Sequence, residues 1–276
     1  RRVLFRSRRR EGVRPGVEPP GKRVQRVGDG LGLVAGDLMV DPVIGGTPTQ
    51  FEARRFNILG SPNQDVGVCI ARADAPFAGF VDVRQREIIT GTTNSGSLTW
   101  PLALNATLGA KFKLVRGYGS GAAMELALER GEVQAISNFY QSLKAAHPQW
   151  FSEKFVRPLA QIGLKGAPEL GATPIAYELA ANEEERQLMR LLFGPLSLPR
   201  LFLAPPDVPR ERLALLRRDY EGVVADADFI AEARRLGFEV APASAADIGA
   251  FLDQAHATPP AVARRAFEIL ERGKLA

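Results

Sequence analysis

The stretch EIITGTTNSGSLTWPLALNATLGAKFKLVRGYGSGAAMELALERGEVQAIS, residues 87–137, alternates short apolar runs with helical segments. Three runs are short, apolar and bounded by turn residues, which predicts strands at 87–90, 112–115 and 133–136. A helix is predicted over 98–108, and Ser120 is the predicted N-cap of a second helix that ends at Gly131. Strand and helix repeated at this spacing indicate parallel strands joined by helical crossovers.

The sequence on either side extends the pattern. Further apolar runs predict strands at 66–71, 155–163, 201–204 and 238–241. A helix with an acidic first turn is predicted at 183–193. Four more are predicted to begin at Pro209, Asp226, Ser244 and Thr258, with Asp226 and Ser244 as N-caps. Upstream, the sequence predicts one short helix over residues 31–40 and a short strand at Val43-Ile44. The fold class predicted from these elements is α/β.

Composition describes an ordinary globular chain. Its 276 residues suffice for one large domain or two of roughly 100–150 residues. Hydrophobic residues make up 45% and charged residues 24%, so a core can form without metal or disulfide staples. The single Cys excludes disulfides and thiolate metal clusters within the chain. No apolar stretch approaches the ~20 residues of a membrane span.

The basic charge lies at the start of the chain. The pI is about 9.6, yet residues 1–30 hold ten Arg or Lys against three Asp or Glu, and the remainder is slightly acidic. A charge block of this kind is typical of disorder, so we expect a disordered basic tail over 1–30 rather than a nucleic-acid-binding arm. We also expect the start to be truncated, so that the signal peptide of the parent protein is missing.

Two turns of small polar residues follow predicted strands. They are TTNSGS, residues 92–97, and YGSG, residues 118–121. In a parallel sheet ligands bind at the carboxyl ends of strands, where free helix amides and hydroxyl groups hold anions. Ser137-Asn138 ends the next strand and would face the same rim. The same residue types also make ordinary turns and N-caps, so residue spacing leaves both interpretations open.

Enzyme chemistry has little support in the sequence. The two histidines, His147 and His256, are predicted to be surface residues, and Cys69 lies inside an apolar run as an inert core thiol. Neither a nucleophile elbow nor a phosphate loop occurs. Residues 30–35 match the glycine pattern of a dinucleotide-binding fingerprint, but the apolar strand that should precede this pattern is absent. We therefore predict no catalytic residue, no cofactor and no metal site.

From about Phe56 to Ala266 the chain resembles the Bug-type periplasmic solute receptors of tripartite tricarboxylate transporters. FNILGS with VGVCIARAD is similar to the strand that enters their second lobe. ITGTTNSGS with LGAKF resembles their carboxylate-binding turn and helix, and GYGSGAAMELALERGEVQAIS their next turn–helix–strand unit. The segment FLAPPDVPRERLALLRRDYEGVVADADFIAEARRLGFEVAP resembles their return into the first lobe.

This resemblance implies a type II periplasmic-binding fold, with two lobes of mainly parallel sheets closing on a ligand. The first lobe would be incomplete, formed by residues 31–70 and 205–276, and the second would span 71–204. The implied function is capture of a small carboxylated metabolite for transport. The implied partners are that ligand and the membrane components of the transporter, without nucleic acid, and the protein is expected to be a periplasmic monomer.

The resemblance also implies which residues hold the ligand. Ser95 and Ser97, with the amides of 94–97, would bind a carboxylate, while 118–121 and Ser137 would supply the second and third turns. The full predicted set is Thr47, Thr92, Thr93, Asn94, Ser95, Gly96, Ser97, Tyr118, Gly119, Ser120, Gly121, Ser137 and Asn138. The competing hypothesis is the ligand-sensing effector domain of a transcriptional regulator with the same fold. Such a regulator needs a helix-turn-helix, and residues 1–30 have no helical periodicity to form one.

Overall fold

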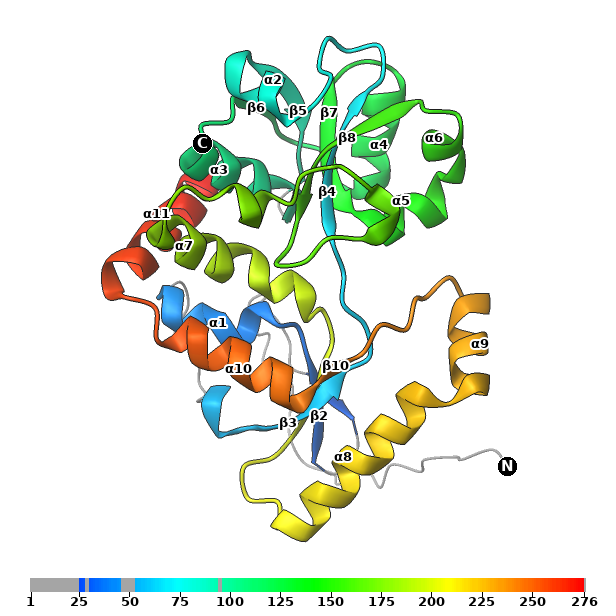
Figure 1. The fold of residues 1–276 in the computed structure, drawn as a ribbon, viewed down its shortest axis with the longest axis vertical. Coiled ribbons are helices and arrows are strands. Elements are labelled where there is room, and N and C mark those ends of the chain that lie inside the picture. Colours follow the sequence, from blue (N-terminus) through cyan, green and yellow to red (C-terminus); the bar gives the residue numbers. More distant parts are fainter. Residues whose placement is uncertain (1–24, 28–29, 46–52, 94–95, 276) are drawn as a thin grey trace, which may run out of the picture.

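A computed structural model gives the fold, and it describes residues 25–27, 30–45, 53–93 and 96–275. This part of the chain forms two five-stranded sheets with helices packed around them (Figure 1). One sheet lies in the upper half of the view and the other in the lower half, and helix α7 (Glu183–Phe193) lies between the two halves. The α/β class predicted from the sequence is confirmed.

The upper sheet contains the repeated unit of residues 87–137, in the strand order β6-β5-β7-β4-β8. Its strands are β4 (Gly67–Arg72), β5 (Ile88–Gly91), β6 (Phe112–Val115), β7 (Ala135–Phe139) and β8 (Val156–Ile162). Strand β5 pairs in parallel with β6 and β7, and β4 runs antiparallel to β7 and β8. The crossovers are α3 (Gly96–Leu108) and α4 (Gly121–Glu129). The parallel arrangement predicted for the repeated unit is confirmed.

The lower sheet has the strand order β1-β2-β9-β3-β10. Its strands are β1 (Gln25–Val27), β2 (Leu31–Val34), β3 (Asn57–Ser61), β9 (Leu201–Ala204) and β10 (Ala243–Ser244). Every described pair in it is antiparallel, whereas mainly parallel strands were expected. The physical reason is that distant parts of the chain meet here, without the repeated strand–helix crossover that makes neighbours parallel.

Local signals account for several helix ends. The Ser120 side chain accepts a hydrogen bond from the Ala123 N–H at 3.2 Å, which confirms it as the N-cap of α4. The helix ends just before Gly131, whose φ of 74° is in the left-handed region that favours glycine. Asp226 and Ser244 are likewise confirmed as N-caps, accepting from the Phe229 and Asp247 N–H groups.

The remaining helices surround and connect the sheets. They are α1 (Asp37–Ile44), α2 (Phe80–Gln85), α5 (Tyr140–Ala146), α6 (Pro148–Ser152), α8 (Arg210–Ala225), α9 (Ala227–Arg235), α10 (Ala245–His256) and α11 (Pro260–Leu275). Short 3₁₀ turns are η1 (Ala53–Arg55), η2 (Pro168–Leu170), η3 (Ala176–Leu179) and η4 (Gly194–Ser197). Among the described residues, no helix is long and apolar enough to cross a membrane.

One buried cluster reaches from the lower sheet to the upper one. It joins Val34 and Leu201 below, Cys69 and Leu159 above, and Phe193 at the end of α7. A smaller cluster on the upper sheet includes Met124, Leu128 and Trp150 from α4 and α6. Helix α11 packs against both α3 and α7. The two lobes therefore share a continuous core along α7 rather than meeting only through linkers.

Several boundaries differ from those predicted. Residues 31–40 begin as strand β2 and not as a helix, and Val43-Ile44 lies in α1. Strand β4 belongs to the upper sheet and β9 to the lower, although the lobe boundaries were placed at 70/71 and 204/205. Gln25–Val27 pairs with β2, so these residues are not part of a free tail. The prediction of disorder for residues 1–24 lies outside the described residues.

Candidate functional site

A cavity of about 1000 Å³ lies among elements attached to both sheets. Three of the predicted site residues line it: Gly96 and Ser97 from the first turn of α3, and Asn138 from the end of β7. The other walls come from α1, the segment between β3 and β4, α5, α7 with η4 and the residues after it, the segment around Phe238, and α11. Thr47, Asn94 and Ser95, which were also predicted, lie outside the described residues.

The turn before α3 is closed by its own hydroxyl groups. The Thr93 N–H donates to Ser97 Oγ at 2.9 Å, and the two side-chain hydroxyl oxygens lie 2.8 Å apart. Thr92 is fully buried, and both its N–H and its Oγ donate to the Val115 carbonyl, at 2.8 and 3.3 Å. Thr92 therefore holds the turn against β6 through hydrogen bonds, while Ser97 hydrogen-bonds to Thr93 and also lines the cavity.

The second predicted turn, Tyr118–Gly121, is not among the residues that line this cavity. Ser120 is exposed and uses its side chain to cap α4. Tyr118 packs against the smaller buried cluster. A Cβ added at Gly121 would lie 3.6 Å from both Asn138 Nδ2 and Glu125 Oε1, so this end of the turn lies beside Asn138, which does line the cavity.

Ser137 and Asn138 face opposite sides of the upper sheet, as neighbours in a strand do. Ser137 has no exposed surface, and its Oγ lies 2.9 Å from Cys69 Sγ. Burial raises the pKa of the Cys69 thiol to about 12, so the thiol stays protonated and unreactive. Asn138 thus supplies the cavity contact at this strand end, and Ser137 is directed into the core.

Charged side chains on the cavity wall were missed by the sequence analysis. Asp65, Arg200 and Glu239 all line it, from irregular segments that carry no recognisable motif. Burial raises the pKa of the Asp65 carboxyl to about 6, against a hydrogen bond from the Val66 N–H at 2.9 Å and the charge of Arg200. Glu239 reinforces the rise by like-charge repulsion.

The raised pKa of Asp65 predicts a pH-dependent stability cost. The folded protein holds this proton up to about pH 6, whereas the unfolded chain loses it near pH 4, so stability falls as pH rises between them. Asp65→Asn, which can still accept from the Val66 N–H, is expected to stabilise the fold by about 1–2 kcal/mol near pH 8, after discounting for solvent screening. The gain should vanish near pH 4 in urea unfolding, and an equal gain at both pH values would contradict the assignment.

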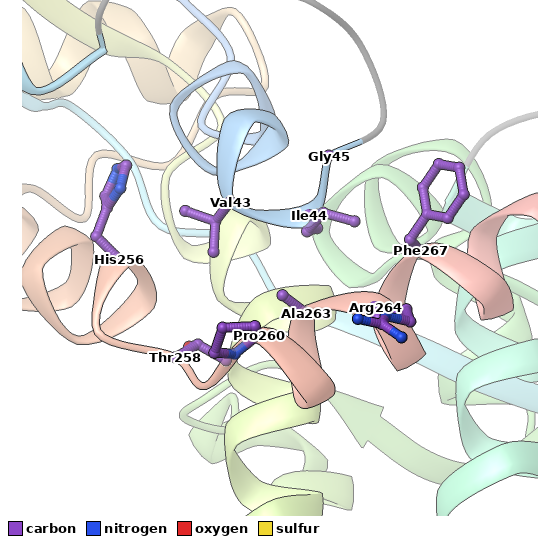
Figure 2. A pocket seen from close by; sticks show the side chains of 9 residues that line it. All are labelled: Val43, Ile44, Gly45, His256, Thr258, Pro260, Ala263, Arg264 and Phe267. Carbon is purple, nitrogen blue, oxygen red and sulfur yellow. The ribbon is translucent and has the colours of Figure 1, made fainter.

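A second, smaller cavity of about 430 Å³ lies where α1, α10 and α11 meet. Figure 2 shows His256 of α10, Ile44 of α1 and Arg264 of α11 around it. His256 is not a surface residue as predicted, because its Nε2 is buried without a hydrogen-bond partner among the described residues. Burial, aided by the charge of Arg54, lowers the pKa of this ring. None of the predicted ligand-binding residues that the structure describes lines this cavity.

His147 is also half-buried rather than on the surface, with 20% of its side chain exposed. Its Nε2 lies 3.0 Å from Glu125 Oε2, and its ring stacks on Trp150 with centroids 4.0 Å apart. Among the described residues no group of three or more His, Cys, Asp or Glu is placed to hold a metal ion.

Solute-binding proteins share this fold. A TctC solute-binding protein from Polaromonas, solved without ligand, gives a TM-score of 0.65 at 20% identity over 85% of this chain and 77% of its own. The MatC protein of Rhodopseudomonas palustris, solved with bound malate, gives 0.52 at 16% identity over 87% and 78%. An R. palustris protein solved with adipate gives 0.50 at 18% identity over 82% and 75%. No family model and no curated protein matches the chain.

At these identities the comparisons establish the fold. The α/β fold with two sheets matches the architecture that the sequence resemblance predicted, apart from the antiparallel pairing of the lower sheet. The chain is therefore similar in fold to the TctC and Bug-type periplasmic solute-binding proteins.

Proposed function

We propose that this protein is a non-enzymatic periplasmic receptor that captures a small carboxylated solute for a tripartite tricarboxylate-type transporter. One observation carries the proposal: the first turn of α3 forms part of the wall of the large cavity through Gly96 and Ser97. The amide dipoles of this 13-residue helix favour an anion at that end. Two proteins of the same fold were solved with dicarboxylates, malate and adipate, which supports the ligand class.

The proposed binding residues have different roles. Gly96 brings the first turn of α3 to the cavity wall, Ser97 supplies a hydroxyl group, and Asn138 supplies an amide. Thr92 and Thr93 hold the turn in place through their hydrogen bonds. The membrane components of the transporter are the proposed partners, and the receptor is proposed to act as a monomer.

Calorimetry against malate, adipate and other small organic acids tests this function. Binding of at least one acid with a Kd below about 1 mM is the expected result. Titration of a neutral sugar and of a polyamine under the same conditions provides controls for nonspecific heat. If no acid binds even at concentrations well above about 1 mM, or if the polyamine binds best, the proposed ligand class is wrong.

Ser97→Ala is expected to weaken acid binding by about tenfold, the loss that follows from one charge-assisted hydrogen bond and a loosened turn. Because Ser97 Oγ also accepts from the Thr93 N–H, stability should fall by about 1 kcal/mol. Thr107→Ala is the matched control on the same helix, since Thr107 Oγ donates to the Ala103 carbonyl away from the cavity. Equal affinity of Ser97→Ala, Thr107→Ala and wild type would show that Ser97 is only a structural residue.

A further inference from the structure

Asn138 is held in one orientation by its neighbours. Its Nδ2 donates to Glu125 Oε1 at 2.8 Å, and its Oδ1 accepts from the Phe139 N–H at 2.8 Å. A carboxylate oxygen only accepts and a backbone N–H only donates, so the amide nitrogen must face Glu125 and its oxygen must face Phe139. A flipped amide would place oxygen against oxygen at one contact and two donors at the other.

Glu125 is itself fixed, because it lies on α4 with only 12% of its side chain exposed. While Oε1 accepts from Asn138, Oε2 lies 3.0 Å from His147 Nε2. The His147 ring is stacked on Trp150, with an angle of 10° between the rings. Trp150 Nε1 donates to Glu129 Oε1, one turn along α4 from Glu125, at 3.1 Å. The contacts thus run from the cavity wall to the stacked pair formed by His147, which lies between α5 and α6, and Trp150 of α6.

From this geometry we infer that Glu125 and His147 are positioning residues that make Asn138 a hydrogen-bond donor toward the ligand. The inference rests on the proposed function and deepens it. One of the two Nδ2 hydrogens is used by Glu125, and the other is left for a group in the cavity that Asn138 lines. The Phe139 N–H that Oδ1 accepts polarises the amide and strengthens its remaining N–H as a donor. The position therefore selects a ligand oxygen that accepts, such as a carboxylate, hydroxyl or carbonyl oxygen, and disfavours an ammonium group.

The first test needs no ligand. The side-chain amide protons of Asn138, assigned by their loss in Asn138→Asp, can be followed by ¹H–¹⁵N NMR. In wild type the proton that faces the carboxylate should lie downfield of its position in a solvated amide, and the group should be rigid. Glu125→Ala should move both signals toward the two separate shifts of a mobile, solvated amide, while Glu125→Gln, which keeps an acceptor oxygen, should stay close to wild type. Glu132→Ala, which removes an exposed carboxylate just after α4, is the control.

The second test uses malate as the probe in calorimetry. Glu125→Ala should weaken malate binding about fivefold to tenfold, consistent with losing the orientation of one hydrogen-bonding group, and Glu125→Gln should remain within about twofold of wild type. Unchanged Asn138 amide signals in Glu125→Ala would overturn the positioning role whatever the ligand is. Altered signals with unchanged malate affinity would overturn the contribution to binding. Failure of wild type to bind any acid would count against the proposed function, while the NMR result still decides the positioning role.

Discussion

Trp100→Ala is expected to destabilise the protein by about 3–5 kcal/mol, the range for removing a large buried aromatic side chain. Trp100 is 2% exposed and stands edge-on to Phe139, with ring centroids 5.3 Å apart. Gly67 and Gly96 make room for its ring, because a Cβ added at either would lie within 2.8 Å of it. The ring therefore packs α3 directly against Gly67, the first residue of β4.

This substitution should also damage the cavity, because Trp100 lines it beside Gly96 and Phe139. Trp100→Phe is the matched control: it keeps an aromatic ring against Phe139 and should lose roughly 1–2 kcal/mol, well below the alanine variant. Urea unfolding measures both stabilities, and calorimetry with malate measures both affinities. A loss below about 1 kcal/mol in Trp100→Ala would mean that the ring does not pack as the structure shows.

The repeated unit of residues 87–137 was predictable because its signals are local. Ser120 as an N-cap and Gly131 as a helix stop each act within one helical turn, so a short window of sequence contains the whole cause. The pairing of β4 and β9 is different. An apolar run such as 66–71 indicates that a strand is buried, but not which sheet covers it or in which direction it runs. Sequence patterns therefore predicted these strands without predicting their partners.

The segment 31–44 was mispredicted for a related reason. Its apolar residues suit either a strand or a helix, and four residues are too few to show a period. Pairing of β2 with β1 on one side and β9 on the other selects the strand, and the helix begins only after Gly36. Both selecting contacts are tertiary, so local propensity could not supply them.

The sequence predicted which turns could hold a ligand, but not which of their residues line the cavity. Ser97 and Ser120 belong to similar turns, yet Ser97 lines the cavity and Ser120 caps a helix at the surface. Strand alternation predicts that Ser137 and Asn138 face opposite ways, although it does not say which of them faces the core. Asp65 and Arg200 lie in irregular segments, so only the folded chain shows that they meet the cavity.

Gly36→Ala is expected to destabilise the protein by about 2–3 kcal/mol, the usual cost of forcing atoms into a packed site. A Cβ at Gly36 would lie 2.7 Å from the Leu198 carbonyl oxygen and 3.0 Å from the Pro195 carbonyl oxygen. Both obstacles are backbone atoms, so no rotamer change can relieve the clash. The Gly36 N–H also donates to the Leu198 carbonyl at 3.0 Å, and moving the two segments apart would weaken that bond.

The consequence for function follows from where this contact lies. Gly36 precedes α1, and Pro195 belongs to η4; both line the large cavity, so separating them changes the width of the site. Malate affinity is therefore expected to fall about tenfold or more, since a displacement of about 1 Å is enough to disrupt positioned contacts. Gly79→Ala is the matched control, because Gly79 is also a helix N-cap glycine but has open space at its Cβ position, and it should cost less than about 1 kcal/mol. Urea unfolding measures the stability of the two variants, and calorimetry measures their malate affinity. Equal losses of stability and affinity in both would mean that α1 and η4 are not in contact through Gly36, and that this contact does not form part of the cavity wall.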